Sequence, residues 1–359
     1  MQHRCGIDRR LLRYHDNLIY MPRSMEAREP RAVTIRCREL LVSVLPPQVE
    51  VSTSGPDRVV VNGTELIVAW AGEGSLPDVR RVLATGPRRP QLVAARRLSP
   101  GARAELSSSG VGWVDESGAA EIAVGSIVVV RPGLVDSARH RPPGWTAATE
   151  AVAEALLSDI SPTVDAVAAT TGLSTGSCVT ALRTLTDLKL LTHGAKRGRG
   201  SGRRIVDPDR LLDAYATAAA ARKRPPSLRV GVAWRDVVDA TIDVGKSWTA
   251  EGIVWAATGA VASMVTAPHL TNVNTSDVYI AGTSLTDLAH AARAVGLEPM
   301  EGGRLQLICF PTVTTSRLIE EADGMMVAPW PRVFADLRVW GVRGEDLAEH
   351  LREIRRRGR

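Results

Sequence analysis

The chain has 359 residues, of which 44% are hydrophobic and 23% are charged, an ordinary composition for globular domains. This length is enough for two or three domains, each with its own hydrophobic core. No apolar stretch approaches the ~20 residues that cross a membrane, and the N-terminus lacks an apolar signal core, so we expect a cytoplasmic protein without membrane contact. The net charge of +6 is modest, so local clusters of basic residues indicate an anionic partner better than the total does.

The cysteines and histidines indicate no metal centre. The four cysteines are scattered and form no CxxC pair, which favours a reducing compartment and argues against a zinc site. The seven histidines likewise show no metal-ligand spacing. We therefore expect neither a metal nor another cofactor. The cysteines are Cys5, Cys37, Cys178 and Cys309.

The first 138 residues divide into a tail and a small α/β domain. Residues 1–30 hold many arginines without periodicity, so we expect a flexible basic tail, and translation could start at Met1, Met21 or Met25. Residues 31–138 alternate helical and strand patterns. The expected helices are Val33–Leu45, Leu76–Ala84 and a helix from Ser99-Pro100 to near Gly110, and the expected strands are Val49–Val51, Arg58–Val61, Glu65–Ala71, Gln91–Ala95, Trp113–Asp115, Ala119–Ala123 and Ser126–Val130.

Residues 145–207 have the pattern of a winged helix-turn-helix domain, which is three short helices followed by a hairpin. The first helix is expected at Thr149–Asp159, and Ser161-Pro162 is expected to open the second, with serine as its N-cap. Gly172-Leu173-Ser174 is the predicted turn. There glycine permits a left-handed conformation, leucine fills the angle between the helices, and serine caps the third helix.

The third helix, from Thr175 to about Leu188, is the predicted DNA-reading helix. One of its faces is apolar and is expected to be buried against the other helices. The opposite face carries short hydrogen-bonding groups and one guanidinium, which suit contacts with base edges in a major groove. The predicted core residues are Val179, Leu182, Leu185 and Leu188, and the predicted DNA-contacting residues are Thr175, Ser177, Thr180, Arg183 and Thr184.

A glycine-rich basic hairpin follows the third helix. Leu190–Thr192 and Arg203–Val206 are the expected strands, and the tip between them carries no acid. Concentrated positive charge on such a loop is typical of contacts with phosphates, which release counterions. A solvated charged loop behind an ordinary helical bundle is the alternative, but its position after a helix-turn-helix pattern favours binding of double-stranded DNA. The basic residues predicted to contact DNA are Lys196, Arg197, Arg199, Arg203 and Arg204.

Two basic Pro-Pro segments, 139–143 and 222–226, bracket this central domain. Because paired prolines stiffen a linker, residues 208–227 are expected to form a linker helix and a linker. Both basic segments could contact phosphates or simply be solvated. Residues 228–359 alternate strand and helix patterns once more. The expected fold class is therefore α/β multidomain, with two mixed α/β domains flanking a central winged helix-turn-helix.

Two sets of motifs resemble known families. Residues 94–103 (AARRLSPGAR) and 111–115 (VGWVD) are similar to the amino-terminal domain of actinobacterial winged-helix regulators, which is a degenerate relative of the restriction-endonuclease fold. Residues 323–329 (DGMMVAP), 334–337 (FADL) and 341–351 (GVRGEDLAEHL) resemble the carboxy-terminal domain of AbiEi-type antitoxins. The resemblance covers most of the chain after the tail. It implies a DNA-binding protein that represses its own operon and offsets a nucleotidyltransferase toxin, although those antitoxins usually carry the winged helix at the amino terminus.

A nuclease of the restriction fold needs two acids and usually a lysine, which together hold a metal and activate water. Asp57, Glu65, Asp115 and Glu121 offer acids, but no lysine occurs before Lys189. We therefore expect this domain to be catalytically inactive, with the acids as turn and surface residues.

Two other short motifs also have plainer interpretations than catalysis. Asp243–Ser247 ends like a phosphate-binding loop, but the glycine that the motif requires five residues before Gly245 is Ala240. Gly282–Ser284 with Asp287 faintly suggests a nucleotidyltransferase signature, but capping of a helix by the serine explains these residues better. We expect no enzymatic activity.

The sequence therefore predicts a sequence-specific transcription regulator that binds double-stranded DNA and autoregulates its own operon. The alternative is an antitoxin of a type IV toxin–antitoxin or phage-defence system that acts mainly through protein interaction. An active nuclease is the third and weakest hypothesis. The two α/β domains would serve as dimerisation, partner or effector modules, which makes a second copy of the chain and a nucleotidyltransferase-type toxin candidate partners.

Overall fold

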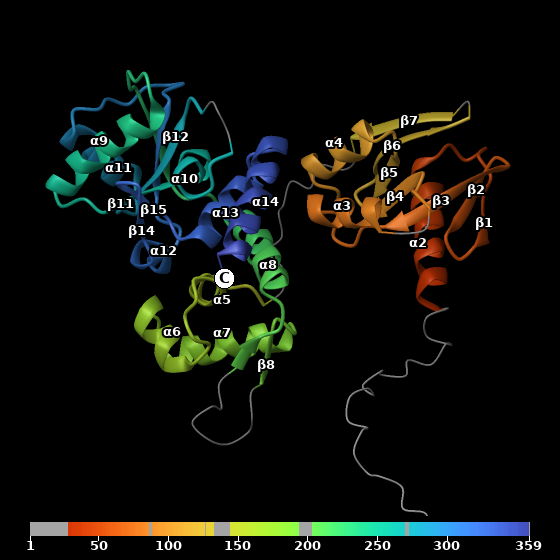
Figure 1. Ribbon diagram of the computed structural model, residues 1–359, viewed down its shortest axis with the longest axis horizontal. Helices are drawn as coiled ribbons and strands as arrows, with labels where there is room; N and C mark the ends of the chain where they lie inside the picture. Colours follow the sequence, from red (N-terminus) through yellow and green to blue (C-terminus); the bar gives the residue numbers. More distant parts are fainter. Residues whose placement is uncertain are drawn as a thin grey trace, which may run out of the picture. The chain divides into compact units, whose positions relative to one another are not determined.

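The chain is a mixed α/β protein, as predicted, and it folds as two compact units in a computed structural model (Figure 1). No helix in the described parts is both long and apolar enough to cross a membrane. The expected basic tail lies almost entirely outside the described residues, as does the tip of the basic hairpin. The structure describes residues 28–85, 88–125, 127–132, 144–193, 203–269 and 273–358.

Unit 1 is built on a sheet whose strands follow chain order from β1 to β7. The pairs β3–β4 and β4–β5 are parallel, and the other neighbours are antiparallel. Helices α3 (Leu76–Ala84) and α4 (Pro100–Ser108) connect the parallel strands, although Ser75–Arg80 and Leu98–Glu105 group with unit 2. The strands are β1 (Val51–Gly55), β2 (Arg58–Val61), β3 (Thr64–Trp70), β4 (Leu92–Ala95), β5 (Gly112–Asp115), β6 (Ala119–Val124) and β7 (Ile127–Pro132).

Helix α2 (Arg28–Val44) covers one face of this sheet because its apolar residues recur at helical spacing. Cys37, Leu41 and Val44 are buried against strand residues such as Val59 and Leu92. Burial raises the pKa of the Cys37 thiol to about 12, so this cysteine is a packed residue rather than a reactive one.

Unit 2 begins with the helix–helix–helix–hairpin order predicted for a winged helix-turn-helix. Helices α5 (Ala147–Leu157), α6 (Val164–Thr171) and α7 (Thr175–Asp187) precede the antiparallel strands β8 (Leu191–His193) and β9 (Arg203–Ile205). Helix α8 (Pro208–Ala220) then continues from an Asp207 N-cap.

Two details of the predicted helices are wrong. The N-cap of α6 is Thr163, not Ser161, since the Thr163 hydroxyl accepts the N–H of Ala166 at 3.3 Å. On α7, Val179 is only half-buried, and Cys178 and Ala181 join Leu182 in the core instead. The inward face of α7 thus keeps Leu182 and Leu185 as predicted, and Cys178 and Ala181 take the place of Val179.

The remainder of unit 2 is a second α/β sheet with the strand order β10-β13-β12-β11-β15-β14. The pairs β12–β13 and β11–β15 are parallel, and the other neighbours are antiparallel. Its strands are β10 (Ser227–Val230), β11 (Trp255–Thr258), β12 (Ser276–Ile280), β13 (Leu305–Cys309), β14 (Glu320–Ala322) and β15 (Met325–Val327). Its helices are α9 (Val237–Ala250), α10 (Gly259–Thr266), α11 (Leu285–Ala294), α12 (Val313–Arg317), α13 (Trp330–Arg338) and α14 (Val342–Arg357).

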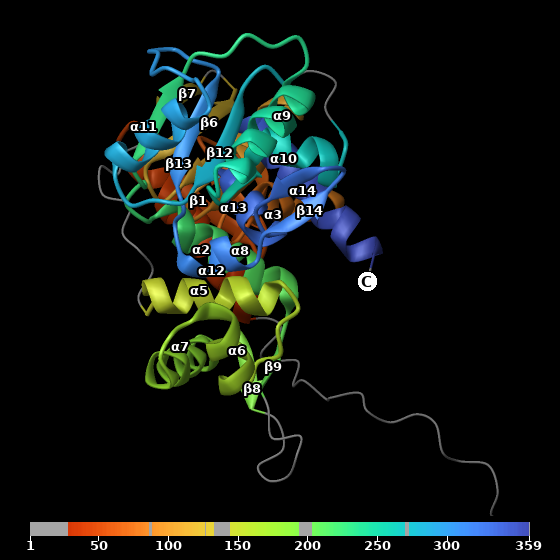
Figure 2. The same cartoon turned by 90° about the vertical axis from the view of Figure 1, so that its left-hand side faces the viewer.

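One continuous hydrophobic core joins the two parts of unit 2, running from Trp145 to Leu351. Figure 2 shows α5 between the pair α6–α7 and helices α8 and α12, and α5 also contacts α13. The side chains of α5 from Thr149 to Leu157 are all buried, so this helix has no solvent-facing side over that length. Trp330 fixes the contact by donating its indole N–H to the Leu157 carbonyl at 3.1 Å.

Candidate nucleic-acid interface

Most of the predicted DNA-contacting residues lie in the described structure, on two adjacent elements. Thr175, Ser177, Thr180, Arg183 and Thr184 lie on α7. Arg203 and Arg204 lie on β9, which pairs with β8 directly after α7. Lys196, Arg197 and Arg199 lie outside the described residues.

The turn before α7 has the predicted geometry. Gly172 ends α6 in the left-handed region, with φ of 68°, where a residue without Cβ is favoured. Ser174 then caps α7 by accepting the N–H of Ser177 at 3.2 Å. Leu173, between them, packs against the core. The position of α7 is therefore set locally by a glycine, a half-buried leucine and a serine cap.

The outward face of α7 presents a hydroxyl and a guanidinium one turn apart. Thr180 and Arg183 are exposed, and no hydrogen bond or ion pair joins either side chain to the described residues. The opposite face is fixed in the core by Leu182 and Leu185, each with 0% of its surface exposed. A side chain on a helix held this way has the fixed geometry that reading a base edge needs.

Two other predicted residues of α7 make contacts within or next to the helix and are only partly exposed. The Thr184 hydroxyl donates to the Thr180 carbonyl at 3.0 Å, and a Cβ at Gly144 would lie 2.9 Å from the Thr184 methyl group. The Ser177 hydroxyl accepts from the Ser174 hydroxyl at 3.0 Å. Both threonine and serine are half-buried. The exposed polar face of α7 is thus narrower than the sequence predicts.

The hairpin directs its two described arginines to opposite faces. Arg203 pairs with His193 and Arg204 pairs with Thr192, so alternation along the strand separates their side chains. Arg204 is exposed, whereas Arg203 is half-buried and its Nε makes no hydrogen bond to the described residues. Arg204 is therefore the better placed of the two for a phosphate.

Sequence reasoning missed two basic residues around the interface. Lys189 is exposed, follows α7 in the left-handed region with φ of 58°, and places a positive charge beside the hairpin. Arg317 of α12 lies against Gly172, with Nη1 3.5 Å from the Thr170 carbonyl oxygen. Lys189 has only a weak signal in the sequence. Arg317 lies far along the chain from the turn that it contacts.

The core behind α7 contains charged residues, and each of them contacts a polar or charged side chain of unit 2. Glu150 of α5 lies 3.0 Å from Arg222, and Glu154 accepts a hydrogen bond from the Tyr215 hydroxyl at 2.7 Å. Burial is the main cause that raises the pKa of Glu154, and it also raises that of Tyr215. These groups tie α5 to α8 and to the segment that follows α8.

The described residues contain no group of three or more histidine, cysteine or acidic side chains placed to hold a metal ion. Asp57 and Glu65 are exposed and lie 3.7 and 2.6 Å from Arg58. Asp115 accepts the N–H of Ser117 at 3.0 Å, within a turn.

The two short motifs considered above have structural explanations. Residues 243–247 lie inside α9, and a Cβ at Gly245 would overlap the Trp255 ring, so this glycine serves packing. Ser284 and Asp287 form a capping box at the start of α11, as predicted from the serine.

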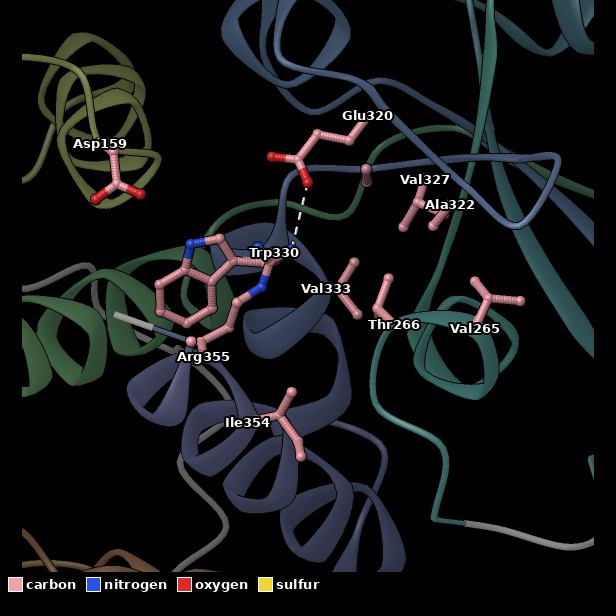
Figure 3. Close-up of a pocket in the computed structure, with 12 residues that line it drawn as sticks. Asp159, Val265, Thr266, Glu320, Ala322, Val327, Trp330, Val333, Ile354 and Arg355 are labelled. Atoms are coloured by element: carbon pink, nitrogen blue, oxygen red, sulfur yellow. Dashed lines mark hydrogen bonds and ion pairs between the residues drawn. The ribbon is translucent and has the colours of Figure 1, made fainter.

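A pocket of about 430 Å³ in unit 2 lies beside Trp330 (Figure 3). Among its charged residues, Glu320 and Arg355 pair with each other at 3.3 Å, and Asp159 also lines the pocket, beside apolar side chains such as Val265 and Ile354. The pocket therefore offers a ligand both polar and apolar surface. Comparison of the chain with protein-family models, curated proteins and solved structures found no match.

Proposed function

We propose that this protein binds duplex DNA through the exposed face of α7 and the basic hairpin, as a transcription regulator that represses its own operon. The observation that carries the proposal is the pair Thr180 and Arg183, exposed on a helix whose other face is fully buried. A hydroxyl and a guanidinium one turn apart on a fixed helix suit hydrogen bonds to base edges. The adjacent hairpin supplies the positive charge for neighbouring phosphates.

The proposal divides the two elements by role. Arg183 on α7 reads one base pair because its backbone is held by the core. Arg197 and Arg199 lie among glycines in the sequence, which gives them reach without fixed geometry, so they contact phosphates or a minor groove. Affinity should therefore depend on both elements, and sequence preference mainly on α7.

A footprint on the protein's own promoter tests this function, with the salt dependence of the affinity as a second readout. If the hairpin and its flanks neutralise about five phosphates, the log–log slope of affinity against salt should be about −4.5. Replacing Arg197 and Arg199 together by alanine should reduce that slope by about two. Absence of a footprint together with a flat salt dependence would reject the proposal.

A second candidate function, that of an antitoxin acting through protein interaction, is favoured by one observation on unit 1. Strand β7 pairs with β6 and with no other strand of the described residues, and it exposes 72% of both Val128 and Val130. An apolar edge strand suits pairing with a strand of a partner. We propose a nucleotidyltransferase-type toxin as that partner.

Co-expression with a nucleotidyltransferase-type toxin tests the second function, and a gene for such a toxin beside this one would favour it. A stable complex should form with the wild-type chain and be lost when Val128 and Val130 are both replaced by lysine. Replacement of Val254, which is also exposed but lies in unit 2, is the matched control. A complex that survives the double replacement would remove β7 from the interaction.

A further inference from the structure

A row of polar side chains crosses one face of the sheet that contains β10 to β15 in unit 2. Arg229 on β10 pairs with Gln306 on β13, Gln306 pairs with Asp277 on β12, and Asp277 pairs with Thr258 on β11. Directly paired residues project to the same face of a sheet, so these four side chains form one polar row across four strands. The next residue along β12, Val278, projects to the other face and is fully buried.

Much of the polar row forms the floor of a pocket of about 260 Å³, to which Thr258, Asp277 and Gln306 contribute. The segment after α8 supplies one wall with Lys223 and Arg224, both exposed. The connection between α13 and α14 supplies another with Trp340, whose surface is 47% exposed. The pocket thus combines an acid on its floor, basic groups on one side and an indole ring on another.

Two carboxylates line this pocket, and they differ in what holds them. Asp336 accepts hydrogen bonds from Thr258 and Tyr279, both at 2.6 Å, and pairs with Arg332. Asp277 accepts no hydrogen bond from the described residues. Burial, with repulsion from Asp336, raises its pKa to about 6. A half-buried carboxylate without protein donors is free to accept hydrogen bonds from a ligand that brings N–H groups.

We propose that this pocket binds a guanine mononucleotide, with the base on Asp277 and Trp340 and the phosphate on Lys223 and Arg224. The N1–H and N2–H groups of guanine are two parallel donors, which match the two oxygens of one carboxylate. The indole of Trp340 offers a flat face on which a base can stack. The two basic side chains balance the phosphate charge.

The pocket is also linked to the helix beneath α7. Arg222 lines it and is 3.0 Å from Glu150 of α5. A phosphate beside Arg222 competes with this glutamate for the guanidinium, which weakens the support of α5 for α6 and α7. If the DNA-binding function proposed above holds, the nucleotide should therefore act as an effector that lowers affinity for the promoter.

Titration calorimetry of the full chain with GMP tests the site without any reference to DNA. Lys223→Gln combined with Arg224→Gln should weaken GMP binding about tenfold or more, as expected for lost charge-assisted contacts. Lys246→Gln, an exposed lysine on α9 outside the pocket, is the matched control and should leave the affinity unchanged. Guanosine and ribose 5-phosphate should each bind more weakly than GMP, since each lacks one half of the ligand.

A change of base preference provides the sharpest test and also controls for misfolding. Asp277→Asn replaces one acceptor by a donor, so the variant should bind GMP about tenfold more weakly and should prefer XMP, which carries a carbonyl where guanine has its amino group. Lack of GMP binding by the wild-type chain, or equal GMP binding by Asp277→Asn, would overturn the site.

The effector role is measured separately, as promoter affinity with and without saturating GMP. A several-fold loss of affinity in the wild type that disappears in Asp277→Asn supports the role. Promoter binding that is unaffected by bound GMP overturns the effector role alone, and a chain that binds GMP but no DNA overturns the DNA-binding function while keeping the site.

Discussion

Helices α5 and α7 both belong to the segment from α5 to β9, yet their polar residues have opposite roles. The side chains of α5 are buried from Thr149 to Leu157, and its acids Glu150 and Glu154 contact Arg222 and Tyr215. Helix α7 buries one face only and leaves Arg183 exposed. The difference teaches that a polar residue on a helix indicates a ligand only where the fold leaves it facing solvent.

The largest expected effect separates the two faces of α7. Leu185→Asp places an unpaired charge at a site with 0% exposure, so it should cost more than about 4 kcal/mol and unfold unit 2. Arg183→Asp, two residues earlier, should change the free energy of unfolding by less than about 0.5 kcal/mol. Thermal melts of both variants measure this contrast, and similar melting temperatures would show that the helix faces are misassigned.

The next effect tests whether the acids of α5 are structural. Glu150→Ala leaves Arg222 without the carboxylate that lies 3.0 Å from it, so we expect a loss of about 2–4 kcal/mol. Asp187→Ala on the exposed end of α7 is the matched control, with an expected change below about 0.5 kcal/mol. Denaturant titrations give both values. Equal changes in the free energy of unfolding of the two variants would mean that the buried pair of Glu150 and Arg222 stabilises the fold no more than an exposed side chain does.

Asp277 sharpens the comparison because it is half-buried, whereas the acids of α5 are fully buried, and because it has no donor among the described residues. Its folded pKa of about 6 exceeds the ordinary 3.8, so the folded chain keeps this proton at pH values where the unfolded chain has lost it. The wild type therefore loses stability as pH rises from about 4 to about 6, and the penalty then stays constant.

Asp277→Asn removes that penalty. The variant should equal the wild type near pH 4 and be more stable by about 1–3 kcal/mol at pH 7. Unfolding free energies at the two pH values measure the difference. A variant that is less stable than the wild type at pH 7 would show that Asp277 has a favourable partner.

Interactions between residues close in the sequence made much of the segment from α5 to β9 predictable. Gly172, Ser174 and the bounds of α7 follow from chemistry within a few residues, namely a left-handed turn, a side-chain cap and an apolar period. The wrong N-cap of α6 has the same origin, because Ser161 and Thr163 are both good capping residues and only the tertiary position of the helix selects one. Val179 and Cys178 are neighbours at the edge of the apolar period of α7, and the packing of the helix buries Cys178 rather than Val179.

Contacts between distant segments were not predictable. The burial of α5 on all sides depends on α12 and α13, which lie more than 150 residues further along the chain. The polar row of Thr258, Asp277 and Gln306 depends on the register of three strands, and none of its members has a local motif. Sequence therefore indicated the surface that the proposal assigns to DNA, while the pocket required the fold.

The central claim is that α7 reads DNA sequence, and Arg183→Ala tests it most directly. The variant and the wild type are titrated with a promoter fragment protected in the footprint and with a scrambled duplex at one salt concentration. Arg235→Ala, an exposed arginine in unit 2 that lies outside α7, is the control. The account predicts that Arg183→Ala loses about 1–3 kcal/mol on the promoter and almost nothing on the scrambled duplex. Equal losses on both duplexes would contradict it.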